Sequence, residues 1–388
     1  MARERGAVDD GVRGGDRKAP RAIVTNRLRI GVDARELIGA TTGVGRYLGE
    51  LLRRWTMRPD SYRRTFVLYA PKPLPLSLPA GTFEARILGR GRGTLWEQTY
   101  LRRAVREDPL DAFFAPAYTA PLGVKIPLAV TIHDISFVAH PEWFRAREGF
   151  RRRWLTRRAA SNARIVFTDS EFSRNEIENH LSVEPSRIEV IPPGVASPAR
   201  KPGAPLAREP LVLFVGSLFN RRRLPDLIAA FARATADLPH ARLAIVGDNR
   251  TWPKQNLAAA AAAHGVAKRI AFKRYITDVE LESLYARASV FAFLSEYEGF
   301  GLTPLEALSY GVPPIVGDTP VAREVYGNAA EFVPIGDVAG TASAIRRFLI
   351  DPPAAAPLLL RAPAILRRYS WDTAADRTLE ALERIARP

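Results

Sequence analysis

Two glutamates, Glu298 and Glu306, stand eight positions apart around a glycine-containing turn in residues 296–306, EYEGFGLTPLE. Gly299 and Gly301 would let the backbone approach a ligand closely, and free amides at a helix N-terminus favour phosphate or hydroxyl oxygens. Carboxylates that flank such a turn can accept paired hydrogen bonds from neighbouring hydroxyl groups. The segment therefore suits a nucleotide sugar, which carries phosphates and diols together.

Local helix chemistry offers a second interpretation of part of this segment. Thr303, Pro304 and Glu306 have the spacing of a capping box with proline at the first helical position, so the Glu306 side chain could bond back to the Thr303 amide. That interpretation leaves Glu298 and the glycine turn without a role. Because a carboxylate accepts several hydrogen bonds, capping and ribose binding are both open to Glu306.

Arg221 and Arg222 follow the strand-like run LVLFVGS and are expected in a loop at its carboxyl end. Paired guanidinium groups bind phosphate in a bidentate manner and would stabilise the charge that develops on a departing nucleoside diphosphate. No Asp-x-Asp pair suits a divalent cation in a cleft, so the sequence predicts a reaction without metal or cofactor. The alternative is a solvated basic helix start.

A second set of candidate residues lies in the first half of the chain. Gly43-Val44-Gly45 precedes an amphipathic stretch, although Leu48 stands where a dinucleotide fingerprint has its third glycine. His133 and Asp134 end the run LAVTIHD, at the strand end where ligand sites gather. We expect His133 to contact the donor sugar or the acceptor, with Asp134 orienting the imidazole. A buried histidine with satisfied hydrogen bonds is the alternative.

Strand-like runs alternate with amphipathic segments along most of the chain. The first series is RIGVD, FVLYA, DAFFA, LAVTIHD, RIVFTDS and IEVIPPG, and the second is LVLFVGS, RLAIVGD, RIAFK, SVFAFLS, PPIVGD and EFVPIGD. Helices are expected at 44–55, about 223–236, 278–287, 303–310 and 338–350. The alternation predicts an α/β protein with parallel sheets covered on both faces.

A proline-rich segment at 191–210 interrupts this alternation and divides the chain. We expect a flexible tail at 1–27, a first Rossmann-like domain at 28–195, a linker at 196–209 and a second Rossmann-like domain at 210–388. Two such doubly wound domains in tandem form a cleft where the carboxyl ends of their strands face each other. The ligand is expected in that cleft.

The 388-residue chain has a formal net charge of +16 and no cysteine, which excludes disulfides, zinc–thiolate sites and thiol nucleophiles. The charge favours anionic partners, although arginine-rich composition can also reflect genome bias. No apolar run approaches the roughly 20 residues of a spanning helix, so a cytoplasmic protein is expected. A nucleic-acid binder is disfavoured, because Glu298 and Glu306 would face phosphates.

One basic and aromatic segment at 143–158 stands out in the first half. It reads WFRAREGFRRRWLTRR and combines Trp143, Phe144, Phe150, Trp154 and Leu155 with arginines. Helices at the surface of anionic membranes have this composition. Peripheral attachment to the inner membrane face is one expectation, and aromatic residues packed in the core behind a solvated arginine face are the other.

The segment 295–318, SEYEGFGLTPLEALSYGVPPIVGD, resembles the Glu-x7-Glu signature of retaining glycosyltransferases of family 4, which have the GT-B fold. Further segments resemble that family in order from about residue 28 to the C-terminus, among them TLWEQTYL, VTIHDISFVAHPEWF, FVGSLFNRRRLPDLIAAF and YSWDTAADRTLEAL. The resemblance implies two Rossmann-like domains and a C-terminal helix that packs back toward the first.

The resemblance also implies roles for individual residues. Glu298 would contact the hydroxyls of the donor sugar, Glu306 the ribose, and the amides from Gly299 through Phe300 and Gly301 to Leu302 the sugar and distal phosphate. Catalytic roles fall on Glu298, Arg221, Arg222 and His133, and further donor contacts on Gly43, Gly45, Ser217, Tyr275 and Ile276. The family usually has lysine where Arg222 stands, and some members have arginine in place of Ser217.

By the same resemblance, the expected activity is transfer of a hexosyl group to a glycan or lipid-linked acceptor in polysaccharide assembly. GDP-mannose is the favoured donor, because VGRY and HDISF resemble mannosyltransferases. UDP-glucose, UDP-N-acetylglucosamine and dTDP-rhamnose remain open as donors. A relative that binds sugar nucleotides without catalysing transfer is a further alternative.

Overall fold

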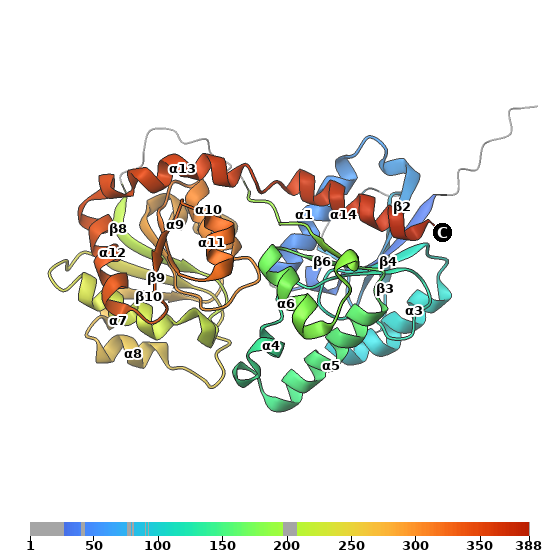
Figure 1. The fold of residues 1–388 in the computed structure, drawn as a ribbon, viewed down its shortest axis with the longest axis horizontal. Helices are drawn as coiled ribbons and strands as arrows, with labels where there is room; N and C mark the ends of the chain where they lie inside the picture. Colours follow the sequence, from blue (N-terminus) through green and yellow to red (C-terminus); the bar gives the residue numbers. More distant parts are fainter. Residues whose placement is uncertain are drawn as a thin grey trace, which may run out of the picture.

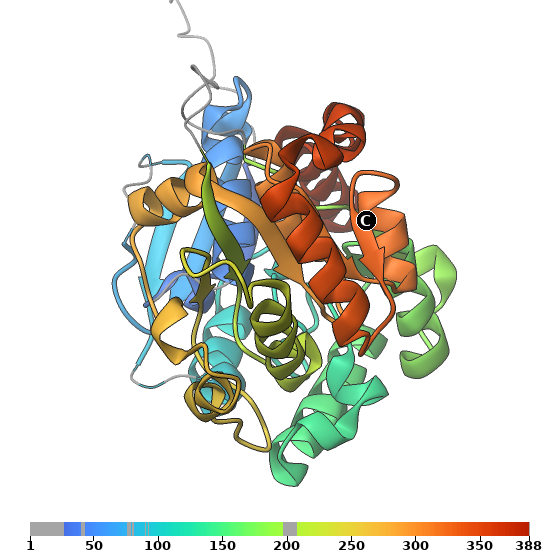
Figure 2. The same cartoon turned by 90° about the vertical axis from the view of Figure 1, so that its left-hand side faces the viewer.

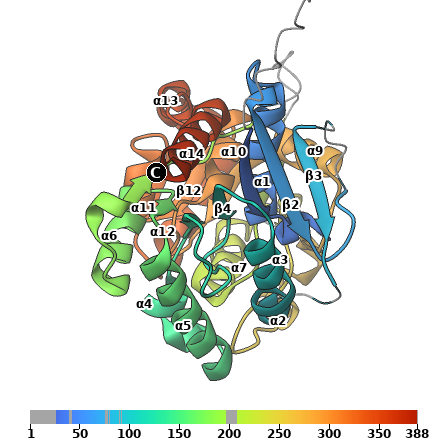
Figure 3. The same cartoon turned by 90° about the vertical axis from the view of Figure 1, so that its right-hand side faces the viewer.

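The computed structural model describes residues 27–39, 43–75, 79, 81–89, 91, 93–196 and 208–387. Most of the predicted tail at 1–27 and of the predicted linker at 196–209 lies outside these residues. The described chain forms two lobes, each with its own parallel sheet (Figure 1). Figure 2 faces the second lobe and Figure 3 the first.

The first sheet has seven parallel strands in the order β3-β2-β1-β4-β5-β6-β7. Most of these strands are buried apolar runs because helices cover both faces of the sheet. The strands are β1 (Leu28–Asp33), β2 (Arg64–Ala70), β3 (Phe83–Ile87), β4 (Ala112–Ala115), β5 (Leu128–Thr131), β6 (Ile165–Thr168) and β7 (Ile188–Val190). Only β3, an edge strand with exposed polar residues, was not predicted.

The second sheet has six parallel strands in the order β10-β9-β8-β11-β12-β13. The strands are β8 (Glu209–Val215), β9 (Arg242–Val246), β10 (Ile270–Lys273), β11 (Ala288–Phe293), β12 (Pro314–Gly317) and β13 (Glu331–Val333). Because β8 and β11 are neighbours, the loops that follow them meet at one edge of the sheet. The predicted α/β class with two doubly wound domains is confirmed.

Helices connect the strands as the sequence pattern predicts. Those of the first half are α1 (Gly43–Met57), α2 (Gly93–Trp96), α3 (Arg102–Glu107), α4 (Ser136–Ala139), α5 (Ala146–Asn162) and α6 (Glu171–Leu181), with a π-helical turn at Glu97–Leu101. Those of the second half are α7 (Leu224–Ala234), α8 (Leu257–Ala263), α9 (Asp278–Arg287), α10 (Leu302–Ser309), α11 (Pro320–Tyr326), α12 (Val338–Ile350) and α13 (Ala356–Leu366).

The last helix, α14 (Trp371–Ala386), leaves the second lobe and packs against α1 of the first (Figures 1 and 3). Its apolar face, including Trp371 and Leu379, belongs to the same buried cluster as Leu48 and Trp55 of α1. The Trp55 indole also donates to the Ala375 carbonyl at 2.9 Å. The predicted return of the C-terminal helix to the first domain is therefore confirmed.

Candidate active site between the two domains

A pocket opens between the two domains, with an empty volume of about 620 Å³ including its mouth. Its walls come from the start of α1, the loops after β5 and β6, the turn before α10 and the start of α14. The lining residues are Gly43, Val44, Tyr47, His133, Asp134, Asp169, Pro193, Glu298, Gly299, Phe300, Gly301, Leu302 and Trp371. The pocket thus brings Gly43 in the first turn of α1 together with the glycine-containing turn at 298–302, while Gly45, also a predicted donor residue, does not line it.

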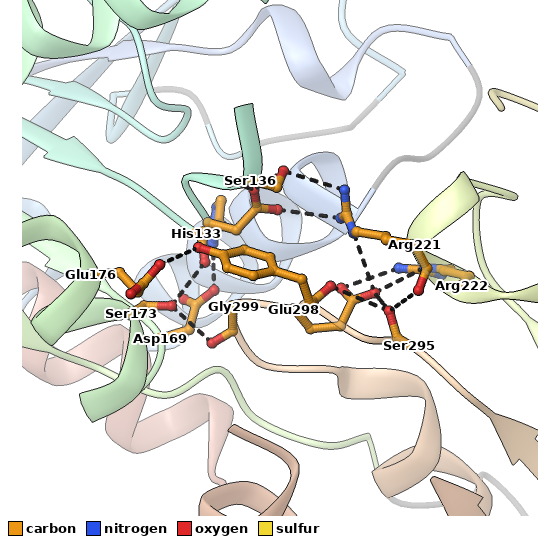
Figure 4. Close-up of polar contacts among 12 residues, drawn as sticks. His133, Ser136, Asp169, Ser173, Glu176, Arg221, Arg222, Ser295, Glu298 and Gly299 are labelled. Carbon is orange, nitrogen blue, oxygen red and sulfur yellow. Dashed lines mark hydrogen bonds and ion pairs between the residues drawn. The ribbon is translucent and has the colours of Figure 1, made fainter. Parts of the chain in front are cut away.

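Glu298 stands at the pocket in the turn between β11 and α10 (Figure 4). Its Oε1 accepts a hydrogen bond from Arg222 Nε at 3.0 Å, and its Oε2 accepts one from Arg222 Nη2 at 3.4 Å. The Ser295 hydroxyl donates to Oε1 at 2.7 Å. These contacts fix the carboxylate and place a guanidinium group directly behind it. The arginine and the glutamate can meet because they lie in the loops that follow the neighbouring strands β8 and β11.

Arg221 lies beside Arg222 in a 3-10 turn after β8, and it is 6% exposed. Its guanidinium contacts Asp134 at 3.5 Å, the Ser136 hydroxyl at 3.3 Å and Glu298 at 3.7 Å. Burial lowers the pKa of Arg221, but Glu298 and Asp134 outweigh it and the net pKa is raised. The structure therefore brings the predicted pair of arginines to Glu298 and across to the first domain.

The carboxylate that contacts the imidazole of His133 is Asp169, which was not a predicted site residue. The imidazole Nδ1 lies 2.8 Å from Asp169 Oδ2, and its Nε2 lies 3.2 Å from the Pro116 carbonyl oxygen. Burial lowers the pKa of His133, but Asp169 raises it more, since both ring nitrogens face acceptors. The predicted orientation by Asp134 is wrong, because that carboxylate accepts from the Ser136 amide and hydroxyl at 2.9 and 2.6 Å.

Asp169 could have been found from the order of the strands. Strands β5 and β6 are neighbours, with Thr131 opposite Phe167, so His133 and Asp169 follow in the same register. Each is the second-last residue of a run expected to be a strand, LAVTIHD and RIVFTDS. Tyr47, the other missed residue beside His133, packs its ring edge-on against the imidazole with centroids 4.9 Å apart. A helical period alone marks Tyr47 only as a core residue.

The backbone at Gly299 in the second domain is in direct contact with the first domain. The Gly299 carbonyl accepts a hydrogen bond from the Ser173 hydroxyl at 3.0 Å (Figure 4). It accepts a second one from the Ser170 hydroxyl at 2.6 Å. A Cβ atom at position 299 would lie 1.7 Å from the His133 carbonyl oxygen. Nearby, the Glu324 carboxylate accepts from the amides of Glu171 and Phe172 at the start of α6. The glycine at 299 is therefore required by close approach of two backbones.

The predicted capping box at Thr303 is wrong. Helix α10 begins at Leu302, with Gly301 as its N-cap at φ 89°, so Thr303 already lies inside the helix. Glu306 is 4% exposed and accepts from the Tyr285 hydroxyl at 3.0 Å and from Arg46 of the first domain. Burial raises the pKa of Glu306. The carboxylate is thus held between two domains and does not cap its own helix.

The structure does not bring every predicted donor residue to the pocket wall. Ser217, Tyr275 and Ile276 follow β8 and β10 at the same sheet edge, but none of them lines the pocket. Tyr275 is 60% exposed. Phe300 does line the pocket, and its ring also packs edge-on against Tyr369 at 5.1 Å. Glu306, the predicted ribose contact, does not line the pocket either, and the donor contacts of these four residues stay predictions.

In the described part of the chain, no group of three or more histidine, cysteine, aspartate or glutamate side chains could hold a metal ion. No single helix there is long and apolar enough to cross a membrane, while one bent pair, Val338–Ile350 with Pro352–Ala386, meets the criteria by length and composition.

Comparison with known proteins identifies the class. Residues 41–198 match the family model Glycosyltransferase Family 4, and residues 198–361 match Glycosyl transferases group 1. The two matches adjoin and fall on the two domains, with the pocket between them. The chain is a glycosyltransferase of the GT-B type.

Curated relatives of this glycosyltransferase include the O-antigen chain mannosyltransferase B of Escherichia coli, 26% identical over 88% of this chain and 95% of that one. Glycogen synthase of Mycobacterium tuberculosis is 30% identical over 68% of this chain and 65% of that one. Among solved structures, sucrose-phosphate synthase from Thermosynechococcus elongatus has a TM-score of 0.74 at 18% identity, covering 92% of this chain and 99% of that one. Anabaena HepE, solved with UDP-glucose, has a TM-score of 0.71 at 18% identity, covering 92% and 100%.

Proposed function

We propose that this glycosyltransferase moves a hexosyl group, with mannosyl as the favoured sugar, from a nucleotide-diphosphate donor to a glycan or lipid-linked acceptor. Synthesis of cell-surface polysaccharide at the cytoplasmic face of the membrane is the proposed setting. The relative that supports this choice over most of its length is the O-antigen chain mannosyltransferase. The reaction is proposed to retain the anomeric configuration.

The observation that carries the proposal is the turn at 298–301. It presents the Glu298 carboxylate and the amides before α10 to the pocket, with Arg222 at 3.0 Å behind the carboxylate. A fixed carboxylate suits sugar hydroxyls, and amides at the positive end of a helix suit the distal phosphate. Opposite them, His133 and Gly43 line the same pocket from the first domain.

In the proposed step, the bond between the anomeric carbon and the phosphate oxygen breaks while an acceptor hydroxyl bonds to that carbon from the same face. The hydroxyl proton passes to the departing phosphate oxygen. Arg221, Arg222 and the amides of α10 stabilise the negative charge on the nucleoside diphosphate, so no metal ion or cofactor is proposed. His133, held by Asp169 at 2.8 Å, is proposed to contact the donor sugar or the acceptor.

Donor identity is tested by a thermal-shift panel of GDP, UDP, dTDP and ADP sugars. A ligand that binds only the folded state raises stability in proportion to the logarithm of its excess over Kd. GDP-mannose is expected to give the largest shift. UDP-glucose, UDP-N-acetylglucosamine and dTDP-rhamnose are the alternatives, since glycogen synthase is also a relative and HepE was solved with UDP-glucose.

Turnover of the stabilising donor, measured with and without EDTA, then separates an enzyme from a silent binding protein. Equal rates in both conditions are expected, because arginines and helix amides hold the leaving group. Loss of turnover in EDTA would contradict the metal-free mechanism. Donor binding without hydrolysis or transfer would instead favour the non-catalytic alternative.

We also propose that the segment 143–158 touches an anionic membrane. Some of its apolar residues are packed inside the protein: Leu155 is buried, and Trp143 stacks on His140 at 3.9 Å. Two others are available to a membrane, since Phe150 is 66% and Trp154 45% exposed. The two exposed rings stand four positions apart on α5 and so share a face. Exposed arginines surround them, Arg147, Arg151, Arg157 and Arg158.

Sedimentation with liposomes tests this surface. The protein is expected to sediment with phosphatidylglycerol liposomes at low salt, and the double variant Phe150→Ser, Trp154→Ser is expected to sediment less. Neutral phosphatidylcholine liposomes provide the control. Failure of the wild-type protein to bind anionic liposomes would remove the membrane from the proposal.

A further inference from the structure

Arg46 reaches from the first domain into the second. It lies in the first turn of α1, directly after Gly43-Val44-Gly45, and its side chain is 36% exposed. Its Nη1 donates to Glu306 Oε1 on α10, 260 residues away in the chain. Gly43 and Val44 of the same helical turn line the pocket, so the pair of Arg46 with the carboxylate proposed to hold the ribose lies next to the pocket wall without lining it.

Glu306 has limited capacity for a further ligand in this arrangement. Its Oε1 accepts from Arg46 and its Oε2 accepts from the Tyr285 hydroxyl at 3.0 Å. A ribose diol that bonds to both carboxylate oxygens therefore shares Oε1 with the guanidinium or displaces it. Because the Arg46 side chain is partly exposed while Glu306 is 4% exposed, the arginine is the partner that can move.

The charges around the pocket indicate where Arg46 would move. Three lining residues are acids, Asp134, Asp169 and Glu298. The arginines nearest to them are already paired: Arg222 with Glu298 at 3.0 Å, and Arg221 with Asp134 at 3.5 Å. Arg221 and Arg222 would therefore act on the diphosphate while they also compensate these carboxylates, so a further cation would complete its neutralisation. Arg46 can supply such a cation, since ribose would replace it on Glu306.

We infer that Arg46 is an exchanging residue of the donor site, paired with Glu306 in this structure and bonded to the diphosphate once the ribose occupies Glu306. This inference rests on the proposed nucleotide-sugar donor. An arginine can bond two phosphate oxygens at once. Because Arg46 belongs to the first domain and the nucleotide to the second, the exchange links donor binding to the contact between the domains.

Calorimetric titration with UDP and uridine, and with GDP and guanosine, tests this exchange in wild type, Arg46→Gln and Arg46→Lys. Glutamine keeps a donor for Glu306 but removes the charge, so the buried carboxylate retains a hydrogen bond. Arg46→Gln is expected to raise the Kd of the nucleoside diphosphate by about 10- to 100-fold, the effect of losing one charge-assisted hydrogen bond. Binding of the matching nucleoside should be unchanged or tighter. Arg46→Lys should lose less affinity for the nucleoside diphosphate than Arg46→Gln does.

Arg53→Gln is the matched control. Arg53 lies on the same helix with its side chain 54% exposed, and it pairs with Glu50 at 2.9 Å, a neighbour on that helix. It should bind like wild type. Equal weakening of diphosphate and nucleoside by Arg46→Gln would overturn the inference, as would unchanged or tighter diphosphate binding. Wild-type protein that binds none of GDP, UDP, dTDP and ADP would instead remove the proposed donor class and the inference with it.

Discussion

Glu298→Gln is expected to lower kcat/KM by about 100-fold, the loss that follows when hydrogen bonds to a charged group are replaced by neutral ones. The carboxylate has two functions that an amide cannot share. In the proposed complex it offers both oxygens to the sugar hydroxyls, and in the structure it balances Arg222 at 3.0 Å and Arg221 at 3.7 Å. Steady-state kinetics with the donor found in the thermal-shift panel measures the effect.

Glu296→Gln is the matched control for this change. Glu296 stands two positions earlier in the same loop and pairs with Arg223 at 3.1 Å, outside the pocket lining. Its kcat/KM should stay close to that of wild type. If Glu298→Gln retained wild-type kcat/KM with a folded circular dichroism spectrum, the proposed contact between Glu298 and the sugar would be wrong.

Gly299→Ala is expected to reduce kcat/KM by a similar factor for a purely geometric reason. The added Cβ would lie 1.7 Å from the His133 carbonyl oxygen and 3.1 Å from the Asp134 Cβ. Backbone atoms cannot give way as a flexible side chain can, so the two domains must separate by roughly 1 Å or more. A displacement of about 1 Å between reacting groups can cost about 100-fold in rate.

A helical glycine provides the control for Gly299→Ala. At Gly49 in α1, a Cβ would meet only Leu37 Cδ2 at 3.9 Å, an ordinary contact. Gly49→Ala should therefore leave kcat/KM unchanged and stabilise the helix by about 1 kcal/mol. Wild-type activity in Gly299→Ala would show that the contact between Gly299 and His133 is dispensable for catalysis.

Much of the fold was predictable because each domain repeats one simple unit. Buried apolar runs that alternate with amphipathic segments specify parallel strands, and each of the twelve runs predicted as strands overlaps one. Loops after neighbouring strands meet at one sheet edge, which explains why Arg222 and Glu298 were predicted together. The edge strand β3 was missed because Glu84 and Arg86 interrupt its apolar pattern.

Contacts between the domains could not be predicted in the same way. The pairing of Arg46 with Glu306 depends on how the two lobes are placed, and no local pattern encodes that placement. The error at Thr303 has a related cause. A sequence pattern for a capping box is satisfied there, but Gly301 starts the helix earlier and the first domain supplies Glu306 with a stronger, charged partner.

Helix α14 has a consequence for the order in which the chain acquires its structure. Trp371, Leu379 and Ile385 belong to the apolar cluster on one face of the first sheet, so that cluster stays incomplete until α14 has left the ribosome. All six strands of the second sheet lie within 209–333 and are released earlier. The half that is translated first is thus completed last, and until then it presents an uncovered apolar surface of the kind that chaperones bind.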